Sequence, residues 1–351
     1  MTSRPRSTSP TRSTSRTVFT AHSPGDVIAS LPTMFGFSPQ ESFVAVATHG
    51  PRNRFGFCMR VDLPPAEHAD EVARTAVGHL RRNEAEGAML LALTDDHARG
   101  EAMVRAALAA LPADVEPIVV VWADGRRYWQ PLPGFPSHGV RYDASPHHRS
   151  VVQAIAEGQV ILPDREALVA RFAACTGEVR RRMEEVVAGE LDRVLRIFGG
   201  QPSDSGLLAA ARAEIDPILR RALRRRDRMS DRDVAVVALW CASVVVRDHL
   251  MTRIRRDEAE QWLRVLTEVA GRVTPGFEPS VLCLAGFAAY RCGDGTQALI
   301  ALERALDADP DHHLGQLLMQ LLQAGVPPED LDLFQQLDPV QESELDEERD
   351  A

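Results

Sequence analysis

Two stretches near the start of the chain have the residue pattern of β-strands. Residues 43–48 and 55–63 are rich in apolar and aromatic residues, and the Gly, Pro and Asn between them favour a turn. The second stretch alternates apolar with smaller or polar residues, which is typical of a strand with one face in the core. This pattern predicts a β-hairpin that ends at Pro64 and Pro65.

Helical spacing and short apolar runs alternate after this hairpin. Residues 66–85 and 97–111 carry apolar side chains at helical spacing, and each is followed by a strand-like run, "GAMLLALTDD" and "EPIVVVWADG". Two consecutive strand–helix–strand units imply right-handed crossovers and a parallel sheet centre. The turn at Asp124-Gly125 then leads into a short last strand. We therefore expect an α/β domain with a mixed, mainly parallel sheet and an antiparallel hairpin at its edge.

The segment before the hairpin is unusually apolar. Residues 27–37 include Leu31, Phe35 and Phe37. We interpret them as a short helix and loop that cover an open end of the sheet.

Strand patterns disappear after Ser145, and helical spacing takes over. Ser145-Pro146 fits a helix start, and Ser230 with Asp233 fits a capping box for a helix over 231–251. Further helices are expected near 258–272, 279–292, 296–308 and 312–324, and a loop over 199–206. The second half is thus predicted to be an all-α domain.

One helical pair in this half has the spacing of a tetratricopeptide hairpin. Gly286, Ala298, Ala305 and Pro310 occupy small-residue and terminal-proline positions, and residues 293–295 form the turn. A single copy is too few for a superhelix, so we expect a helical pair packed on the rest of its domain. Arg291 and Gln297 are the candidate partner surface of this hairpin.

Four segments follow from these patterns. Residues 1–22 are predicted to be a disordered basic tail, 23–144 the α/β domain, 145–330 the helical domain and 331–351 an acidic tail. With 351 residues, about two domains is also the expectation from length.

Charge and composition exclude several classes of function. The net charge is −10, which argues against general attraction to nucleic acid or anionic membrane, so nucleic acid contact is expected only through the basic N-terminal tail. All 40 basic residues are arginine, which excludes a Schiff-base lysine, a P-loop lysine and a lysine-linked biotinyl or lipoyl cofactor. No cofactor is predicted.

The compartment follows from cysteines and hydropathy. The five cysteines have no C-x-x-C spacing and stand among apolar residues, as in reduced thiols of a cytoplasmic protein. The apolar stretch from Val234 to Val246 is far shorter than the roughly 20 residues of a membrane span, so it is interpreted as a core helix. The N-terminus lacks the apolar region of a secretory signal.

Six motifs stand in an order that resembles a known family. They are "LPTMFGFSPQESFVAV", "RVDLP", "DGRRYW", "VRDHL", "YRCGDGTQALIALERALDADP" and "GVPP". Together they resemble an actinobacterial family of uncharacterised proteins with a domain of unknown function, over roughly residues 23–330. Met34-Phe35 replaces the leucine pair usual in that family. The resemblance implies an actinobacterial cytoplasmic protein and no established activity.

Polar residues at the strand ends are the main candidates for a ligand cleft. Ligands of open parallel sheets bind at the carboxyl ends of strands, where Asp62, Asp95 or Asp96, and Asp124 are expected. Together they could hold Mg²⁺. The alternative, which we favour, is that Asp95 or Asp96 caps the next helix and Asp124 forms the hairpin turn, so no metal is predicted.

Basic and aromatic residues extend this candidate cleft. Arg60 and Arg126 could bind a phosphate or carboxylate while Trp129 stacks on a ring. The favoured alternative is that Arg60 pairs with a nearby acid and Trp129 covers the sheet. His147 and His148 are interpreted as surface residues without a third ligand.

Two charged motifs in the helical half are left without a site. "RRALRRRDR" at 220–228 could touch nucleic acid, but the neighbouring acids favour a charged helix end. Arg247-Asp248 is expected to form a buried ion pair.

Two functions remain open from the sequence. The favoured one is a non-catalytic interaction or regulatory protein that binds a protein partner through its helical domain. The alternative is an enzyme or small-ligand-binding protein that uses the strand-end cleft. An exposed apolar helical surface would support the first, and a concave polar cleft the second.

Overall fold

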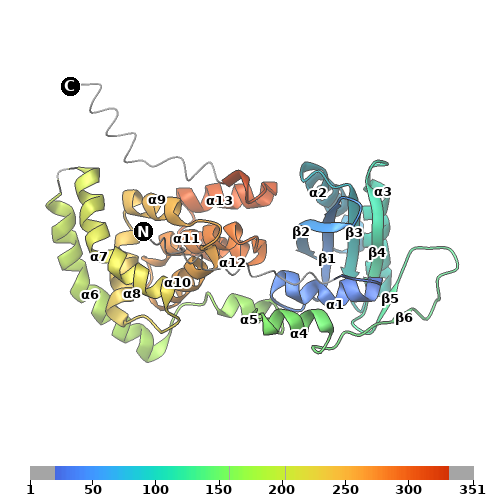
Figure 1. The fold of residues 1–351 in the computed structure, drawn as a ribbon, viewed down its shortest axis with the longest axis horizontal. Coiled ribbons are helices and arrows are strands. Elements are labelled where there is room, and N and C mark those ends of the chain that lie inside the picture. Colours follow the sequence, from blue (N-terminus) through green and yellow to red (C-terminus); the bar gives the residue numbers. More distant parts are fainter. Residues whose placement is uncertain (1–19, 158, 202, 332–351) are drawn as a thin grey trace, which may run out of the picture.

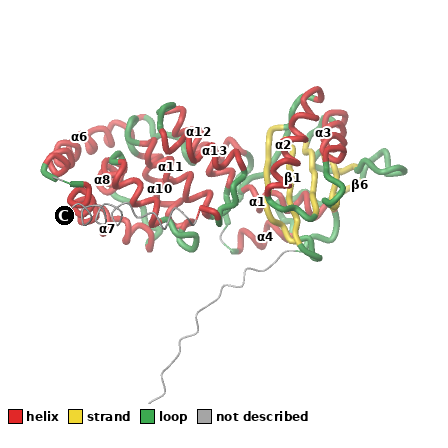
Figure 2. Tube along the Cα trace, turned by 90° about the horizontal axis from the view of Figure 1, so that it is seen from above, coloured by secondary structure: helices red, strands yellow, loops and turns green. Residues whose placement is uncertain are grey.

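The architecture was determined from a computed structural model, which describes residues 20–157, 159–201 and 203–331. An α/β part is followed by an all-helical part (Figures 1 and 2). The predicted fold class is confirmed. The predicted terminal tails lie outside the described residues, apart from residues 20–22 and 331.

Six strands form the single sheet that holds the first half together. In chain order they are β1 (Ser42–His49), β2 (Arg54–Asp62), β3 (Gly87–Leu93), β4 (Glu116–Ala123), β5 (Arg127–Trp129) and β6 (Val140–Arg141). Their order across the sheet is β2-β1-β3-β4-β5-β6. The predicted hairpin is β1 and β2, which pair antiparallel.

The sheet is mixed, but fewer neighbouring strands are parallel than the sequence predicted. Only β3 and β4 form a parallel pair, while β1 lies antiparallel between β2 and β3. The crossover through α2 (Ala69–Arg82) still joins two strands of the same direction, because it passes over β1. The prediction of a mainly parallel sheet is therefore wrong in which strands lie next to each other. The alternation of residues along one strand does not show which strands will be its neighbours.

Side chains of alternating parity divide the sheet between two clusters. Ala45, Leu90 and Trp122 belong to the cluster with α2 and α3 (His97–Ala110). Val44 and Leu91 belong to the cluster on the other face, with α1 (Pro24–Phe35). The sheet is therefore the middle of three layers.

The apolar segment 27–37 forms a helix and loop, as predicted, but it covers a different part of the sheet. Leu31, Phe35 and Phe37 are buried in the cluster that contains Val44 and Leu91. They cover that face of the sheet and not an open end. Gly36 ends α1 with φ 73°, a left-handed conformation that glycine adopts without strain.

Ten helices of the described residues follow the sheet. They are α4 (Arg149–Ala156), α5 (Arg165–Ala170), α6 (Gly177–Gly199), α7 (Asp204–Arg224), α8 (Asp231–Cys241), α9 (Val244–Arg253), α10 (Ala259–Arg272), α11 (Glu278–Arg291), α12 (Gly295–Ala308) and α13 (His313–Ala324). Figure 1 shows α4 and α5 running between the sheet and the remaining helices.

Two helix boundaries differ from the predicted ones. The helix expected over 231–251 is two helices, α8 and α9. The chain bends by 106° at the break between them. The bend lets both helices bury apolar residues, because α8 is buried all round and α9 contributes Val246 and Leu250 to the same core. The helix after Ser145 begins at Arg149 with His148 as its N-cap, so Pro146 lies before the helix and not inside it.

No described helix is by itself long and apolar enough to cross a membrane. The pair α8 and α9 reaches the required length and composition only when the two bent helices are counted together.

The two parts touch through a small set of polar contacts and a shared apolar cluster. Arg82 and Asn83, at the end of α2, donate hydrogen bonds to the carbonyls of Ala324 and Gly325 at 3.1 and 3.3 Å. Buried apolar residues continue from the sheet through Leu168 into the helical part. The predicted domain boundaries stay a prediction.

Candidate functional site

The topology brings the predicted strand-end residues to one edge of the sheet. Ser42 is opposite both Asp62 of β2 and Leu93 of β3, and Leu93 is opposite Ala123 of β4. Asp62 ends β2, and Asp95 and Asp124 come just after β3 and β4, so all three stand where strands end at the same level. We refer to this region as the carboxyl edge.

Arg60 and Asp62 form a local ion pair at this edge. Their atoms Nη1 and Oδ1 are 2.7 Å apart, and the Asp62 side chain is 86% exposed. Arg60 also donates from Nε to the Ser42 hydroxyl at 2.8 Å. Burial lowers the pKa of Arg60, and the Asp62 charge opposes that shift. The pair thus fixes Arg60 across β1 and β2 and leaves Asp62 in solvent.

The aspartates after β3 and β4 have local backbone partners. Asp96 caps α3 by accepting a hydrogen bond from the Arg99 amide at 3.1 Å, while Asp95 is exposed. Asp124 accepts hydrogen bonds from the amides of Arg126 and Arg127 at 2.8 and 2.7 Å. These contacts hold the hairpin turn, which is the arrangement expected of a structural aspartate.

Trp129 lies under other side chains of this edge. It is 9% exposed, and its indole donates to the Ser137 carbonyl at 3.0 Å. The ring stacks with Trp122, and His97 meets it edge-on at 4.0 Å between centroids. Trp129 therefore packs the sheet and leaves no free face for a ligand ring. Arg126, by contrast, is exposed.

His97 is a member of this edge that the sequence patterns did not identify. Its Nε2 lies 4.0 Å from Asp124 Oδ2, and about half of the side chain is exposed. Among the described residues, no group of three His, Cys, Asp or Glu side chains is placed to hold a metal ion. The carboxyl edge thus has an accessible imidazole, that of His97, beside the Asp124 carboxylate, which already accepts hydrogen bonds within its turn.

A second polar group lies where α1 meets α4. His148 Nε2 is 3.6 Å from Asp26 Oδ1, and His148 Nδ1 is 2.8 Å from the Ser150 hydroxyl. The backbone hydrogen bond from His22 contributes most to lowering the pKa of Asp26. His148 is buried and caps α4, so its predicted place on the surface is wrong. The order Asp, His, Ser resembles a hydrolytic triad. Ser150 is buried at a helix start, however, so its hydroxyl is not exposed to act as a nucleophile on a substrate.

The candidate partner surface at the tetratricopeptide-like hairpin needs correction. Arg291 is 1% exposed and donates to the Pro328 carbonyl at 3.3 Å, because the segment after α13 covers the end of α11. Gln297 is half-buried and donates from Nε2 to Asp294 at 2.6 Å. Burial raises the pKa of Asp294, the residue that caps α12. Arg291 therefore cannot meet a partner at the surface.

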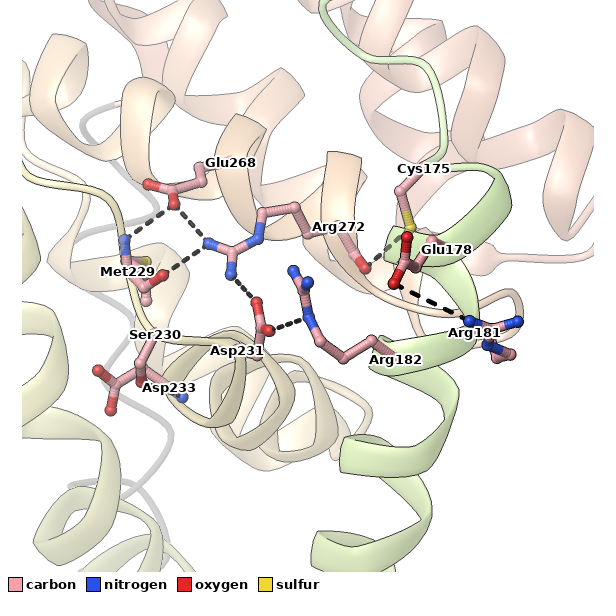
Figure 3. A network of polar contacts seen from close by, with 10 residues as sticks. All are labelled: Cys175, Glu178, Arg181, Arg182, Met229, Ser230, Asp231, Asp233, Glu268 and Arg272. Carbon is pink, nitrogen blue, oxygen red and sulfur yellow. Dashed lines mark hydrogen bonds and ion pairs between the residues drawn. The ribbon is translucent and has the colours of Figure 1, made fainter.

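The helical part contains a connected group of ion pairs around Arg272. Arg272 donates to Glu268 at 2.6 Å and to the Met229 carbonyl at 2.8 Å, and it also pairs with Asp231 (Figure 3). Arg182 pairs with the second oxygen of Asp231 at 2.5 Å. This network joins α6, α8 and α10, so we assign it to the fold.

The expected pair after the long apolar stretch is also present. Arg247 Nη2 lies 2.7 Å from Asp248 Oδ1, with the arginine largely buried and the aspartate partly exposed.

Comparison with known proteins gives one match. No curated protein and no solved structure matches the chain. The profile of a family described as "Domain of unknown function (DUF4192)" matches residues 24–329, nearly all of the described part and both halves of the fold. The chain belongs to the DUF4192 family.

Proposed function

We propose that the protein is a non-catalytic interaction or regulatory protein, and that the exposed apolar face of α4 binds a protein partner. Val152 and Ile155 lie three positions apart on this helix and are 49% and 53% exposed. Val160, just beyond the helix, is exposed as well. Neighbouring exposed apolar side chains favour a protein contact, because water hydrates them unfavourably.

The buried face of α4 explains why this helix is held in place. Val151 and Ala154 are buried, and α4 packs against α1. His148 links the two helices through Asp26. A fixed helix that keeps apolar side chains in solvent is prepared for a partner with a complementary apolar surface. This arrangement is the observation that carries the proposal.

The alternative, an enzyme or ligand-binding protein at the carboxyl edge, has weaker support. Asp62 pairs with Arg60, Asp124 holds a turn, and Trp129 is covered. We further propose an actinobacterial and cytoplasmic protein. The free cysteines and the exclusive use of arginine agree with that origin and location.

The test is recovery of the partner from an actinobacterial lysate by the immobilised full chain. Val152→Asp combined with Ile155→Asp should lower recovery of a specific partner by about tenfold or more, since about 1.4 kcal/mol of binding energy corresponds to that factor. Both sites are exposed, so the melting temperature should change little.

A matched control carries the same change elsewhere. Leu195→Asp combined with Val244→Asp replaces apolar residues that are 55% and 59% exposed on α6 and α9. Recovery should stay at the wild-type level with this control. Equal loss with both variants, or no loss with the α4 variant, would contradict the proposed surface.

A further inference from the structure

The arginine-rich motif at 220–228 lines a pocket at the end of α7. The pocket has a volume of about 450 Å³, and its lining residues are Pro217, Arg220, Arg221, Arg224 and Arg225. Three of its arginines lie on the last two turns of α7, and Arg225 follows directly as the C-cap of the helix. The pocket is open toward solvent, so a ligand in it would be contacted from one side.

The helical spacing explains why these side chains converge. Arg220 and Arg224 are four positions apart and lie one turn apart on the same side of α7, while Arg225 follows the helix as its C-cap in an extended conformation. Arg220, Arg221 and Arg224 span an arc of about 100° around the helix axis. The guanidinium groups are thus presented together toward one side.

Most of this positive charge is not neutralised. Arg221 pairs with Asp233 at 2.7 Å. Arg220 donates from Nε to the backbone carbonyl of Asp216, and the Asp216 carboxylate pairs with Arg253 at 2.5 Å instead. Among the described residues, no acidic side chain forms an ion pair with Arg220, Arg224 or Arg225.

The flanking residues add to the surplus. Arg226 and Arg228 follow the pocket in the chain and are exposed, and Asp227 between them supplies a single negative charge. Like charges gathered at one place repel one another, which costs stability unless an anion balances them.

A purely structural role accounts for only part of this cluster. Basic residues in the last turn of a helix interact favourably with its terminal carbonyls. Arg264 already donates to the carbonyls of Ala222 and Leu223 at 2.7 and 3.3 Å. Arg224 and Arg225 are exposed beside carbonyls that have this partner, so the end of the helix does not require them.

We propose that this pocket binds a small anion that carries two or more phosphate groups. Guanidinium groups bind phosphate oxygens through two parallel hydrogen bonds, and two turns of arginine can engage neighbouring phosphates. The site lies on α7, away from the exposed face of α4, and the inference does not depend on the function proposed above.

Two macromolecular ligands fit the pocket less well. Its lining contains no aromatic side chain for stacking on a nucleic acid base, and the net charge of −10 repels a long polyanion. The same repulsion acts on an acidic polypeptide. A compact anion approaches the local positive charge with less of this repulsion.

Isothermal titration of the full chain with inorganic tripolyphosphate tests the proposal. We expect one binding site per chain, with an affinity that falls as sodium chloride is raised. Arg224→Gln combined with Arg225→Gln should weaken binding at least about tenfold, since each charge-assisted contact is among the stronger hydrogen bonds. Circular dichroism should show an unchanged fold.

The control removes the same charge at another exposed place. Arg52→Gln combined with Arg54→Gln alters two exposed arginines of the β1–β2 hairpin and should leave binding unchanged. The proposal fails if wild type does not bind, if both variants weaken binding equally, or if the α7 variant binds as wild type. It also fails if a polyglutamate peptide or single-stranded RNA binds at α7 more tightly than tripolyphosphate.

Discussion

Arg272 is the best connected charged residue described in the helical part. It is nearly fully buried, yet its guanidinium reaches Glu268 one turn earlier on α10, Asp231 at the start of α8 and the Met229 carbonyl just before α8. A buried charge is costly unless it is paired and hydrogen-bonded, and here Nη1 and Nη2 have such partners, while the buried Nε has no hydrogen-bond partner among the described residues. Its partner Asp231 is the first residue of α8, where a negative charge also interacts favourably with the helix dipole.

Asp231 gives this network an acid-dependent contribution to stability. Burial acts to raise its pKa, but hydrogen bonds from Arg272 and Arg182 outweigh burial and hold the pKa below the ordinary value of 3.8. The folded-state pKa is therefore lower than the unfolded one. The stabilisation is fully present above pH 3.8 and is lost as the pH falls through the folded-state pKa.

Asp231→Asn is expected to lower the free energy of unfolding by about 1–3 kcal/mol at neutral pH, because Arg272 loses its charged partner. The difference from wild type should narrow below pH 3.8. Urea denaturation across this pH range measures both effects. If the free energies of unfolding of the two proteins differed by the same amount at every pH, the assigned pairing of Asp231 with Arg272 would be contradicted.

At the scale of elements, α11 and α12 pack closely, as the small residues in the sequence predicted. A Cβ on Gly286 would lie 2.9 Å from Leu302 Cγ and 3.3 Å from the Ala298 carbonyl. Ala298 and Ala305 are fully buried. Small residues at these positions let the backbones approach, which supports the tetratricopeptide-like interpretation of the pair.

Ala298→Leu should therefore overpack the contact and lower the free energy of unfolding by about 1–3 kcal/mol. Ala308→Leu, at the exposed end of the same helix, is the control and should change stability little. Thermal or urea unfolding gives the comparison. An unchanged stability of Ala298→Leu would show that the two helices are not closely packed.

At the scale of the molecule, α4 and α5 form the connection between the α/β part and the helical part (Figure 1). Arg149 and Arg171 in this connection are exposed. The strands and helices over 66–124 are, by contrast, packed in the three-layer core. Proteases need local unfolding to cut such a core.

Limited trypsin digestion should therefore cleave within or next to 144–171 before it cleaves within 66–124. Mass spectrometry of the first fragments locates the cuts. Earlier cleavage inside 66–124 would contradict both the packing of the core and the predicted division into two domains.

Local patterns were sufficient to predict most elements, since helix and strand periodicity is a property of neighbouring residues. The hairpin, the helix–strand alternation and the cap at Ser230 are examples. The carboxyl edge also follows from strand direction. By contrast, burial of Arg291, the insertion of β1 between β2 and β3, and the bend between α8 and α9 depend on distant segments.

The sequence by itself determined the fold class, the loss of lysine chemistry and the residues that could act at the strand ends. Only the tertiary structure decided their partners. Asp124 accepts hydrogen bonds within its turn, Trp129 is covered by neighbouring side chains, and the arginines at the end of α7 line a pocket. The physical reason is that hydrogen bonding, burial and charge balance depend on which segments pack together, and the order of residues along the chain leaves this open.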